Sequence, residues 1–486
     1  MSDTVIYWFR HDLRLSDLPG LQAASLTGNV IPVFIHDEKL GDDWAIGGAS
    51  RWWLHHSLAS LAGTIEAMGG KLILRRGDTS SELNKLLTET GASHVFASRQ
   101  YQPWSDELER NVHDMASEHG AQFKRYPGTL LFEPGSVATG AGTPFKVFTP
   151  FWRACLRSPQ PEAPKPIPTI SFPEVWPLSD ALDTWNLLPT SPNWAEGWAS
   201  LWRPGEAHAK NVLTEFLDDK VQNYGDGRDI PSKPFTSKLS PYLKFGEISP
   251  RQIWWAAQRC KDQEPGRASA VDKFLSEIGW REFCNHLVAQ FPAMPDKAFN
   301  TKFDHFPWRG ANASLSAWQR GNTGYPIVDA GMRELWQTGF MHNRVRMVVA
   351  SFLTKHLLID WRLGERWFWD TLLDADLASN ACSWQWVAGS GADASPYFRI
   401  FNPVAQGEKF DKSGIYTRRW VPELKDIPDK FLHKPWEAPP LTLETAGIKL
   451  GHTYPSPIVD HKEAREAALS AYATLKALSS EAGVGQ

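Results

Sequence analysis

Hydrophobic residues follow two different patterns along the chain. Up to about residue 135, short apolar runs alternate with longer amphipathic stretches. Short apolar runs between polar turns are typical of buried parallel strands. Five runs therefore predict strands, at residues 5–9, 31–35, 71–75, 94–98 and 123–127. The stretch SRWWLHHSLASLAGTIEAMG predicts a crossover helix. The pattern predicts a Rossmann-like parallel α/β domain over residues 1–135.

From about residue 205 the apolar positions recur with the helical period of 3.6. Residues 324–361, for example, predict two helices with apolar stripes, and strand-like alternation is scarce to the end of the chain. We therefore expect an all-helical domain over residues 205–474 and a tail over 475–486. The intervening residues 136–204 are interpreted as an interdomain linker, since SPQPEAPKPIP has five prolines in eleven positions.

Composition narrows the class of protein. The chain has 486 residues, of which 42% are hydrophobic and 22% charged, so it is long enough for more than one globular domain. Its four cysteines show no CxxC spacing, so neither a disulfide framework nor a metal site is predicted. Charges near the N-terminus and the lack of an apolar run of about 20 residues argue against a signal peptide and a membrane helix. We expect a cytoplasmic protein, and a monomer.

Charge is unevenly distributed. The net charge is −4, but residues 230–434 hold 27 Lys and Arg against 21 Asp and Glu, whereas the remainder holds 24 against 34. A basic region on an acidic chain suits local binding to a polyanion. On charge alone, a chance fluctuation explains the asymmetry equally well.

The stretch NACSWQWVAGSGADASPYFRIFNP, residues 380–403, contains a misleading motif. Gly389, Gly391 and Ala394 match G-x-G-x-x-A. A dinucleotide fingerprint needs a strand before it and a helix after it, and Pro396 and Pro403 rule out a long helix here. The turn after the first predicted strand, FRHDLRLSD, has no G-x-G-x-x-G either. An ordinary dinucleotide site is therefore not expected.

Four other features concentrate side chains of chemical interest. MHNRVRM predicts a helix with Asn343 and Met347 on one face and Arg344 and Arg346 to either side. The other segments are FTSKLSPYL with Thr236, Ser237 and Lys238, EIGWREF with Glu277, Trp280 and Arg281, and DADLASN with Asp374, Asp376 and Asn380. Taken singly, each set fits ordinary ion pairs, helix caps and core aromatics.

Taken together and in this order, the segments resemble the photolyase/cryptochrome family. The resemblance runs from WFRHDLRLSD through VFTPFWRACL, TSKLSPYLKFGEISPRQ, GYPIVDAGMREL and MHNRVRM to QGEKFD and YPSPIVDHKEAR, and so covers nearly the whole chain. It implies an α/β antenna-chromophore domain and a helical domain that holds FAD in a bent conformation. It also implies action on DNA that contains pyrimidine dimers.

The resemblance assigns residues to the cofactor. Those expected to bind FAD are Tyr224, Thr236, Ser237, Lys238, Leu239, Ser240, Arg281, Asn343, Arg346, Asp374, Ala375, Asp376 and Asn380. Asn380 is expected opposite the flavin N5, where an amide tunes the redox state without adding a charge. Trp384, Trp361 and Trp308 are expected to form an electron-hopping chain toward the surface, although most of the 24 tryptophans must simply fill the core.

The resemblance also assigns residues to the substrate. Trp280 and Trp386 are expected to form the walls of a cavity for a flipped-out dimer, with Glu277 on the pyrimidine edge and Asn343 and Met347 on the floor. Three arginines are expected to contact backbone phosphates: Arg228, Arg344 and Arg399.

The implied activity is light-dependent splitting of cyclobutane pyrimidine dimers by a deoxyribodipyrimidine photo-lyase. A cryptochrome-type blue-light receptor is the main alternative, although plant cryptochromes have an acid where this chain has Asn380. A six-four photoproduct photolyase is less favoured, because Asn343 and Met347 resemble the cyclobutane enzymes. A plain flavoprotein oxidoreductase is disfavoured, since nothing resembles a nicotinamide site.

The subclass is indicated by the residues that follow Asn380. The chain is nearer there to class III photolyases, because it has Ala381, Cys382 and Ser383. Through this resemblance the expected antenna is methenyltetrahydrofolate, with a deazaflavin as the alternative.

Overall fold

The computed structural model describes the backbone of residues 3–394 and 398–482. The described chain divides into two compact units. The first contains residues up to 225 together with 237–292 and 373–378, and the second contains 226–236, 293–372 and the residues from 379 onward. The first unit thus includes residues 237–292 and 373–378 of the predicted helical region as well as the α/β domain. The domain limits inferred from the sequence stay a prediction.

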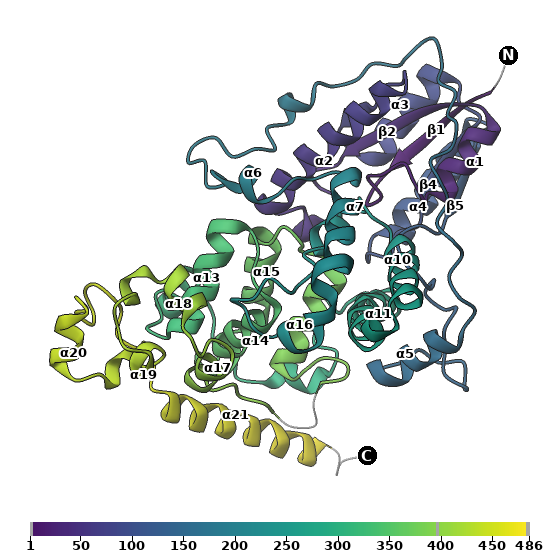
Figure 1. The fold of residues 1–486 in the computed structure, drawn as a ribbon. Coiled ribbons are helices and arrows are strands. Elements are labelled where there is room, and N and C mark those ends of the chain that lie inside the picture. Colours follow the sequence, from purple (N-terminus) through teal and green to yellow (C-terminus); the bar gives the residue numbers. More distant parts are fainter. Residues whose placement is uncertain (1–2, 395–397, 483–486) are drawn as a thin grey trace. The chain divides into compact units, whose positions relative to one another are not determined.

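A five-stranded parallel sheet forms the centre of the α/β part of the first unit (Figure 1), in the order β3-β2-β1-β4-β5. The strands are β1 Thr4–Phe9, β2 Asn29–His36, β3 Ile73–Arg76, β4 His94–Ser98 and β5 Gln122–Tyr126. All five predicted strands are confirmed. β1, β2 and β4 are almost wholly buried, which explains why their sequences are continuous apolar runs.

Helices complete the first unit. They are α1 Pro19–Thr27, α2 Gly48–Ala67, α3 Thr79–Thr90, α4 Ser105–Glu118, α5 Phe148–Arg157, α6 Trp198–Leu201, α7 Glu206–Glu215, α9 Ser240–Lys244, α10 Pro250–Gln263 and α11 Ala268–Gln290, and α8 Tyr224–Gly227 crosses the division. One face of the sheet packs on α3 and α4 through Ile6, Val95, Leu86 and Val112. The predicted crossover helix is confirmed as α2, whereas α5 lies in the segment that we expected to be a linker.

The turn after β1 is a structural junction. The buried Arg14 guanidinium donates hydrogen bonds to the carbonyl oxygens of Ser16, Asp17, Gly128 and Gly246. A charge-assisted donor with four carbonyl partners is well satisfied although it is buried. The family motif at this turn therefore connects β1 to distant parts of the first unit, and it forms no glycine-rich phosphate loop.

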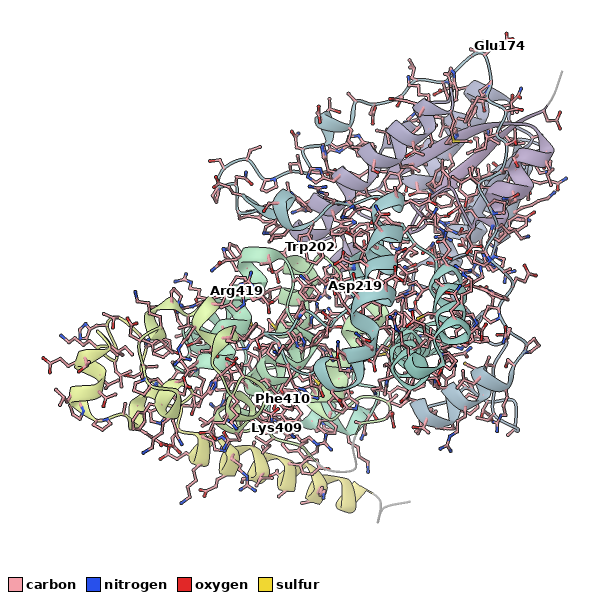
Figure 2. All side chains as sticks on the ribbon, viewed as in Figure 1. Glu174, Trp202, Asp219, Lys409, Phe410 and Arg419 are labelled. Atoms are coloured by element: carbon pink, nitrogen blue, oxygen red, sulfur yellow. The ribbon has the colours of Figure 1, made fainter. Side chains whose placement is uncertain are left out.

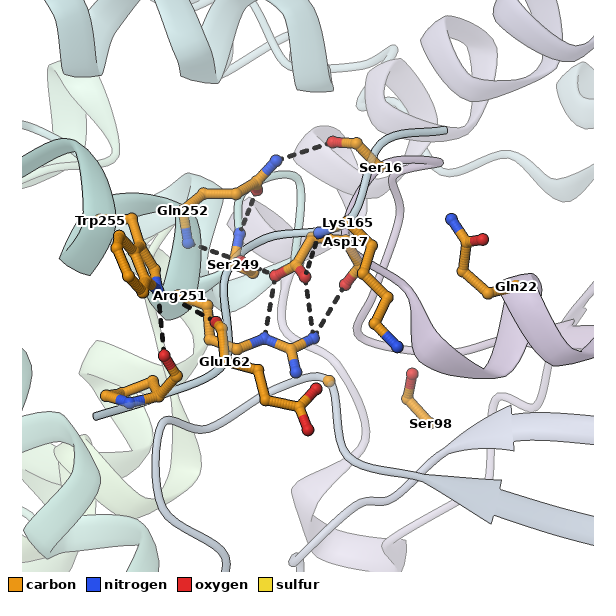
Figure 3. A network of polar contacts seen from close by, with 12 residues as sticks. Ser16, Asp17, Gln22, Ser98, Glu162, Lys165, Ser249, Arg251, Gln252 and Trp255 are labelled. Carbon is orange, nitrogen blue, oxygen red and sulfur yellow. Dashed lines mark hydrogen bonds and ion pairs between the residues drawn. The ribbon is translucent and has the colours of Figure 1, made fainter. Parts of the chain in front are cut away.

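The proline-rich segment is fixed by polar contacts (Figure 3). The Asp17 carboxylate accepts from the Arg251 guanidinium at 3.1 Å and from the Lys165 backbone N–H at 3.2 Å. Further along, the Trp255 indole N–H donates to the Glu162 carbonyl at 3.1 Å. Residues 159–173 form neither helix nor strand, as predicted. This extended segment is held against α10 rather than left without contacts.

The second unit is helical. Its elements are α12 Ala313–Gln319, α13 Pro326–Thr338, α14 Asn343–Ser351, α15 Trp361–Thr371, α16 Leu377–Ala388, whose first two residues belong to the first unit, α17 Pro403–Phe410, α18 Ile415–Trp420, α19 Asp429–Leu432, α20 Pro440–Thr445 and α21 His461–Ala482. The described residues after 126 contain no strand, so the predicted helical region is confirmed. The two helices predicted within 324–361 are α13 and α14.

The C-terminal helix α21 belongs to the core of the second unit. Its residues Ala468, Ala471 and Leu475 are buried with Phe303 and Phe306. The helix continues to Ala482 and so occupies most of the predicted tail, while 483–486 and Pro396 lie outside the described residues. None of the helices described is long and apolar enough to cross a membrane.

Candidate functional site

In the first unit, α9 holds the loop that carries Asp374, Ala375 and Asp376. The Ser240 hydroxyl donates to the Asp374 carboxylate at 2.6 Å, and the Lys244 ammonium donates to the Ala375 carbonyl at 2.5 Å. Two side chains one turn apart on a short helix thus contact a loop 131 to 134 positions further along the chain. The structure therefore brings Ser240 together with the loop that carries three other predicted cofactor residues.

Lys244 was not identified from the sequence. Its side chain is 6% exposed. Burial lowers the pKa of Lys244 to about 8, although Asp376 and Asp374 oppose the shift. Burial, followed by repulsion from Lys244, lowers the pKa of His11 to about 3. A buried lysine near two acidic residues offsets part of their negative charge. A single lysine in an amphipathic segment gives no sequence signal of this role.

The other first-unit candidates have their own contacts. Arg281 donates to the Thr129 carbonyl at 2.9 Å, and its guanidinium lies 3.4 Å from the Glu282 carboxylate. Tyr224 is buried, with its ring 5.8 Å from that of Phe274.

The segment before α9 contains the remaining first-unit candidates. The backbone N–H of Leu239 donates to the Ser237 hydroxyl at 3.4 Å. Lys238 has a φ of +54° and its ammonium lies 5.7 Å from the centre of the Trp202 ring. Thr236 falls in the second unit.

In the second unit, α14 presents the predicted substrate and cofactor residues. Asn343, its first residue, is exposed, and Met347 one turn later is half-buried. His342 caps the helix by accepting from the Arg344 backbone N–H at 3.2 Å. Arg346 donates through Nε to the Met341 carbonyl at 2.7 Å. The geometry confirms the predicted helix.

Asn380 is buried on α16. Its Nδ2 donates to the backbone carbonyl of Glu365 at 3.0 Å. The Glu365 carboxyl itself is 0% exposed, and neither of its oxygens has a hydrogen-bond partner among the described residues. Burial raises the pKa of Glu365 well above its ordinary value, because the charged carboxylate is poorly solvated there. Glu365 was not identified from the sequence, because an acid on an amphipathic helix usually faces solvent.

Trp384 and Trp361 are fully enclosed, whereas Trp308 is half-buried. The Trp384 ring packs edge-on against Phe368 at 5.0 Å and Trp318 at 6.2 Å. Trp308 lies 4.3 Å from Phe306, between ring centres. Of the three predicted chain members, only Trp308 is partly exposed, and the ring contacts of Trp384 involve other residues.

The aromatic residues expected at the substrate are both half-buried. Trp280 on α11 stacks on Phe148 of α5 with ring centres 3.8 Å apart and planes 10° apart. Glu277, three residues before Trp280, lies 3.7 Å from the Lys273 ammonium. Trp386 follows the buried Gln385, whose amide accepts from the Phe299 backbone N–H at 2.7 Å.

The arginines assigned to phosphates differ in their surroundings. Arg399 is exposed and Arg228 is half-buried. Arg344 lies 2.9 Å from the Asp229 carboxylate and 4.4 Å above the Phe410 ring, which α17 presents beside the exposed Lys409 (Figure 2). Arg344 is therefore held in place by a weak, partly exposed ion pair.

The described residues form neither a dinucleotide fingerprint nor a metal site. The stretch with Gly389 and Gly391 follows helix α16 rather than a strand, so it is no dinucleotide fingerprint. Across residues 3–394 and 398–482, no group of three His, Cys, Asp or Glu side chains is arranged to hold a metal ion. No disulfide joins the four cysteines within the described structure.

Comparisons with known proteins find similarity along most of the chain. Residues 5–170 match the DNA photolyase model and residues 274–474 match the FAD binding domain of DNA photolyase. A deoxyribodipyrimidine photo-lyase of Agrobacterium fabrum is 52% identical over 97% of this chain and 98% of the relative. Cryptochrome-2 of Arabidopsis thaliana is 38% identical over 96% of this chain and 78% of its own length.

A solved structure gives the same result. The crystal structure of a bacterial class III photolyase from Agrobacterium tumefaciens superimposes with a TM-score of 0.94 at 52% identity, and covers 98% of both chains. The sequence and the fold both match this photolyase along almost the entire chain. Local motifs alone could not establish a match of that length. The chain therefore belongs to the DNA photolyase and cryptochrome family.

Proposed function

We propose that the protein is a light-driven lyase that splits cyclobutane pyrimidine dimers in DNA. The observation that carries this proposal is the 52% identity to a deoxyribodipyrimidine photo-lyase over almost the full length of both chains. Because both family domains are matched, the chain has the regions needed for a cofactor and for an antenna.

FAD fits the chemistry of the candidate residues. Hydroxyls, carboxylates and cations of Ser240, Asp374, Asp376, Lys238 and Arg281 suit a flavin edge, a ribityl chain and a pyrophosphate. The chemistry that bound, fully reduced FAD would supply here is light-driven transfer of one electron to the linked pyrimidines and its return.

The role of Asn380 follows from its hydrogen bond. Because its Nδ2 donates to the Glu365 carbonyl, its Oδ1 is the atom that we assign to the flavin N5. A neutral acceptor at this position favours the reduced ring, which carries a proton on N5, without adding a charge. Burial of Glu365 likewise disfavours the charged form of its carboxyl.

The substrate is a pair of linked pyrimidines turned out of the duplex. Such a pair is poorly stacked and therefore easier to extrude. Trp280 and Trp386 offer aromatic faces, each worth about 1 to 3 kcal/mol per stacked base. Glu277 would accept from the pyrimidine edge, and Asn343 and Met347 would line the floor of the cavity.

Contacts with the DNA backbone are assigned to Arg228, Arg344 and Arg399. All three lie in the basic region 230–434 or next to it. Phosphate contacts set the position of the protein on DNA and read no sequence, which suits an enzyme that finds damage in any context.

Trp384, Trp361 and Trp308 would deliver electrons to oxidised FAD from the surface. The half-buried Trp308 is the natural exchange point with an external reductant. These residues would restore the reduced cofactor and would not take part in the splitting step itself.

For the antenna we propose methenyltetrahydrofolate, on the similarity to the class III enzyme, with a deazaflavin as the alternative. The absorption spectrum of the purified protein distinguishes them, since a near-ultraviolet band beside the flavin bands supports folate and a band further to the blue supports a deazaflavin. We also propose a cytoplasmic monomer.

The second candidate function is blue-light signalling, since plant cryptochromes are 38% identical to this chain. An amide rather than an acid at position 380 favours repair. A six-four photolyase is less favoured, because Asn343 and Met347 resemble the residues of the cyclobutane enzymes.

The experiment that tests the substrate assignment is Glu277→Ala. Removal of the carboxylate should leave FAD bound but weaken binding of a dimer-containing duplex by about 5- to 150-fold, which corresponds to about 1 to 3 kcal/mol for a lost charge-assisted hydrogen bond. Asp272→Ala on the same helix is the matched control, because it removes an exposed carboxylate that is paired with Lys261. Equal effects of the two variants would contradict the assignment.

A further inference from the structure

Helix α5 places an aromatic ring directly against Trp280. The rings of Phe148 and Trp280 lie face to face, with centres 3.8 Å apart and planes 10° apart. One turn later on α5, Trp152 is nearly parallel to Phe148, at 6.5 Å and 11°. The three rings form a short stack that begins in α5 and ends at α11.

The sequence of α11 permits this close approach. A Cβ atom on Gly279, the residue before Trp280, would lie 2.6 Å from the Trp152 ring. No residue with a side chain fits there without displacement of α5. Phe283 packs edge-on against both Phe148 and Trp280, at 6.0 and 5.9 Å, and so fixes the stack from the side.

The stack limits what Trp280 can do. One face of its ring is covered by Phe148, so a base can stack only on the opposite face. The indole is also restrained from changing rotamer, and ordering a mobile side chain upon binding would lower the affinity. A tryptophan that is already held in place avoids this loss.

We infer that Phe148 is a positioning residue for damage recognition, which holds Trp280 with one face presented to the flipped-out pyrimidine pair. The inference rests on the proposed function, since it assumes that Trp280 receives the substrate. Phe148 lies 132 positions before Trp280, in a segment whose proline-rich surroundings suggest only a linker.

The test compares Phe148→Leu, which keeps an apolar side chain but removes the ring, with Phe148→Tyr, which keeps the stack. Dark binding is measured with the full-length, FAD-loaded protein on two duplexes, one with a single cyclobutane thymine dimer and one undamaged. We expect the leucine variant to lose about 2- to 10-fold of its preference for the damaged duplex, in line with the strength of an aromatic pair. The tyrosine variant should retain the preference.

Phe145→Leu is the matched control, since this phenylalanine lies in the same segment and its ring packs against Phe151. Its preference should equal that of the wild type. If Phe148→Leu fails to fold, Phe148→Met replaces it as a ringless side chain of similar size. An unchanged preference in the ringless variant, or an equal loss in the tyrosine variant, would overturn the inference. Lack of preference in the wild-type protein would instead contradict the proposed function.

Discussion

At the scale of single residues, we assign the supply of electrons to FAD and the repair of the dimer to different side chains. Trp384 is enclosed, and we assign it to reduction of FAD and not to the splitting of the dimer. Trp384→Phe should therefore abolish light-driven reduction of oxidised FAD by an external reductant. Repair by chemically prereduced protein should stay near the wild-type level. Both are measured by absorption spectroscopy under illumination.

A packing defect must be distinguished from a lost electron path. Trp198→Phe is a suitable control, because Trp198 is equally buried but lies in the first unit, within the aromatic cluster of Trp52 and Trp194. Photoreduction that persists in Trp384→Phe would show that electrons reach the flavin by another route.

Arg344 tests the contact with the DNA backbone. Its ion pair with Asp229 is partly exposed and contributes no more than about 1 kcal/mol, so the guanidinium can exchange this partner for a phosphate at little cost. Arg344→Ala should weaken binding of damaged duplexes in any sequence context and reduce the slope of log K against log salt by about one.

Arg366→Ala controls for the loss of one positive charge, since Arg366 is also paired with a surface carboxylate, that of Asp296. A loss of affinity that depends on the bases flanking the lesion would contradict the phosphate assignment for Arg344.

At the scale of helices, the contact of α15 with α16 determines the position of Trp384. A Cβ atom on Gly364 would lie 2.2 Å from the Trp384 ring and 2.6 Å from Leu353. Gly364→Ala should therefore destabilise the protein by about 1 to 3 kcal/mol through overpacking, although alanine is the better helix former. Urea unfolding measures this difference.

The matched control is Gly63→Ala in α2, where a Cβ atom would have no neighbour within 4 Å. It should stabilise the protein by about 1 kcal/mol. Stabilisation by both substitutions would mean that α15 and α16 are less tightly packed than the structure indicates.

The packing of α2 provides a pH-dependent test. The Glu247 carboxyl is buried and accepts from the Trp53 indole N–H at 3.1 Å, and burial raises its pKa from 4.5 to about 8. Between these two pH values the folded state binds more protons than the unfolded state, so stability falls as the pH rises from about 4.5 to 8.

Glu247→Gln removes this titration and keeps a neutral acceptor. At pH 8.5 the variant should be more stable than the wild type by on the order of 4 kcal/mol, and the difference should shrink toward pH 5. Urea unfolding at several pH values measures it. A difference that does not change with pH would show that Glu247 is charged in the folded protein.

At the scale of the whole molecule, the fold was largely predictable. Buried parallel strands give continuous apolar runs, so all five strands and their parallel class followed from the sequence. Helix α5 was missed because the proline-rich stretch 158–168 that follows it made the whole segment look like linker. Apolar periodicity identifies an element but not which distant element it contacts.

The site was predictable only in part. Residues such as Ser240 and Asp374 are 134 positions apart, and only the family resemblance suggested that they act together. Lys244 and Glu365 were missed because burial of a charged side chain depends on contacts that sequence periodicity does not reveal. The stack of Phe148 on Trp280 was missed for the same reason.

The most direct test of the account is repair itself. Protein with fully reduced FAD is mixed with a DNA strand that carries one cyclobutane thymine dimer, and the products are separated by chromatography after exposure to blue or near-ultraviolet light. The account predicts recovery of two intact thymines in the light and none in the dark. An unchanged dimer after illumination, despite a normal spectrum of reduced flavin, would contradict it and favour a light receptor.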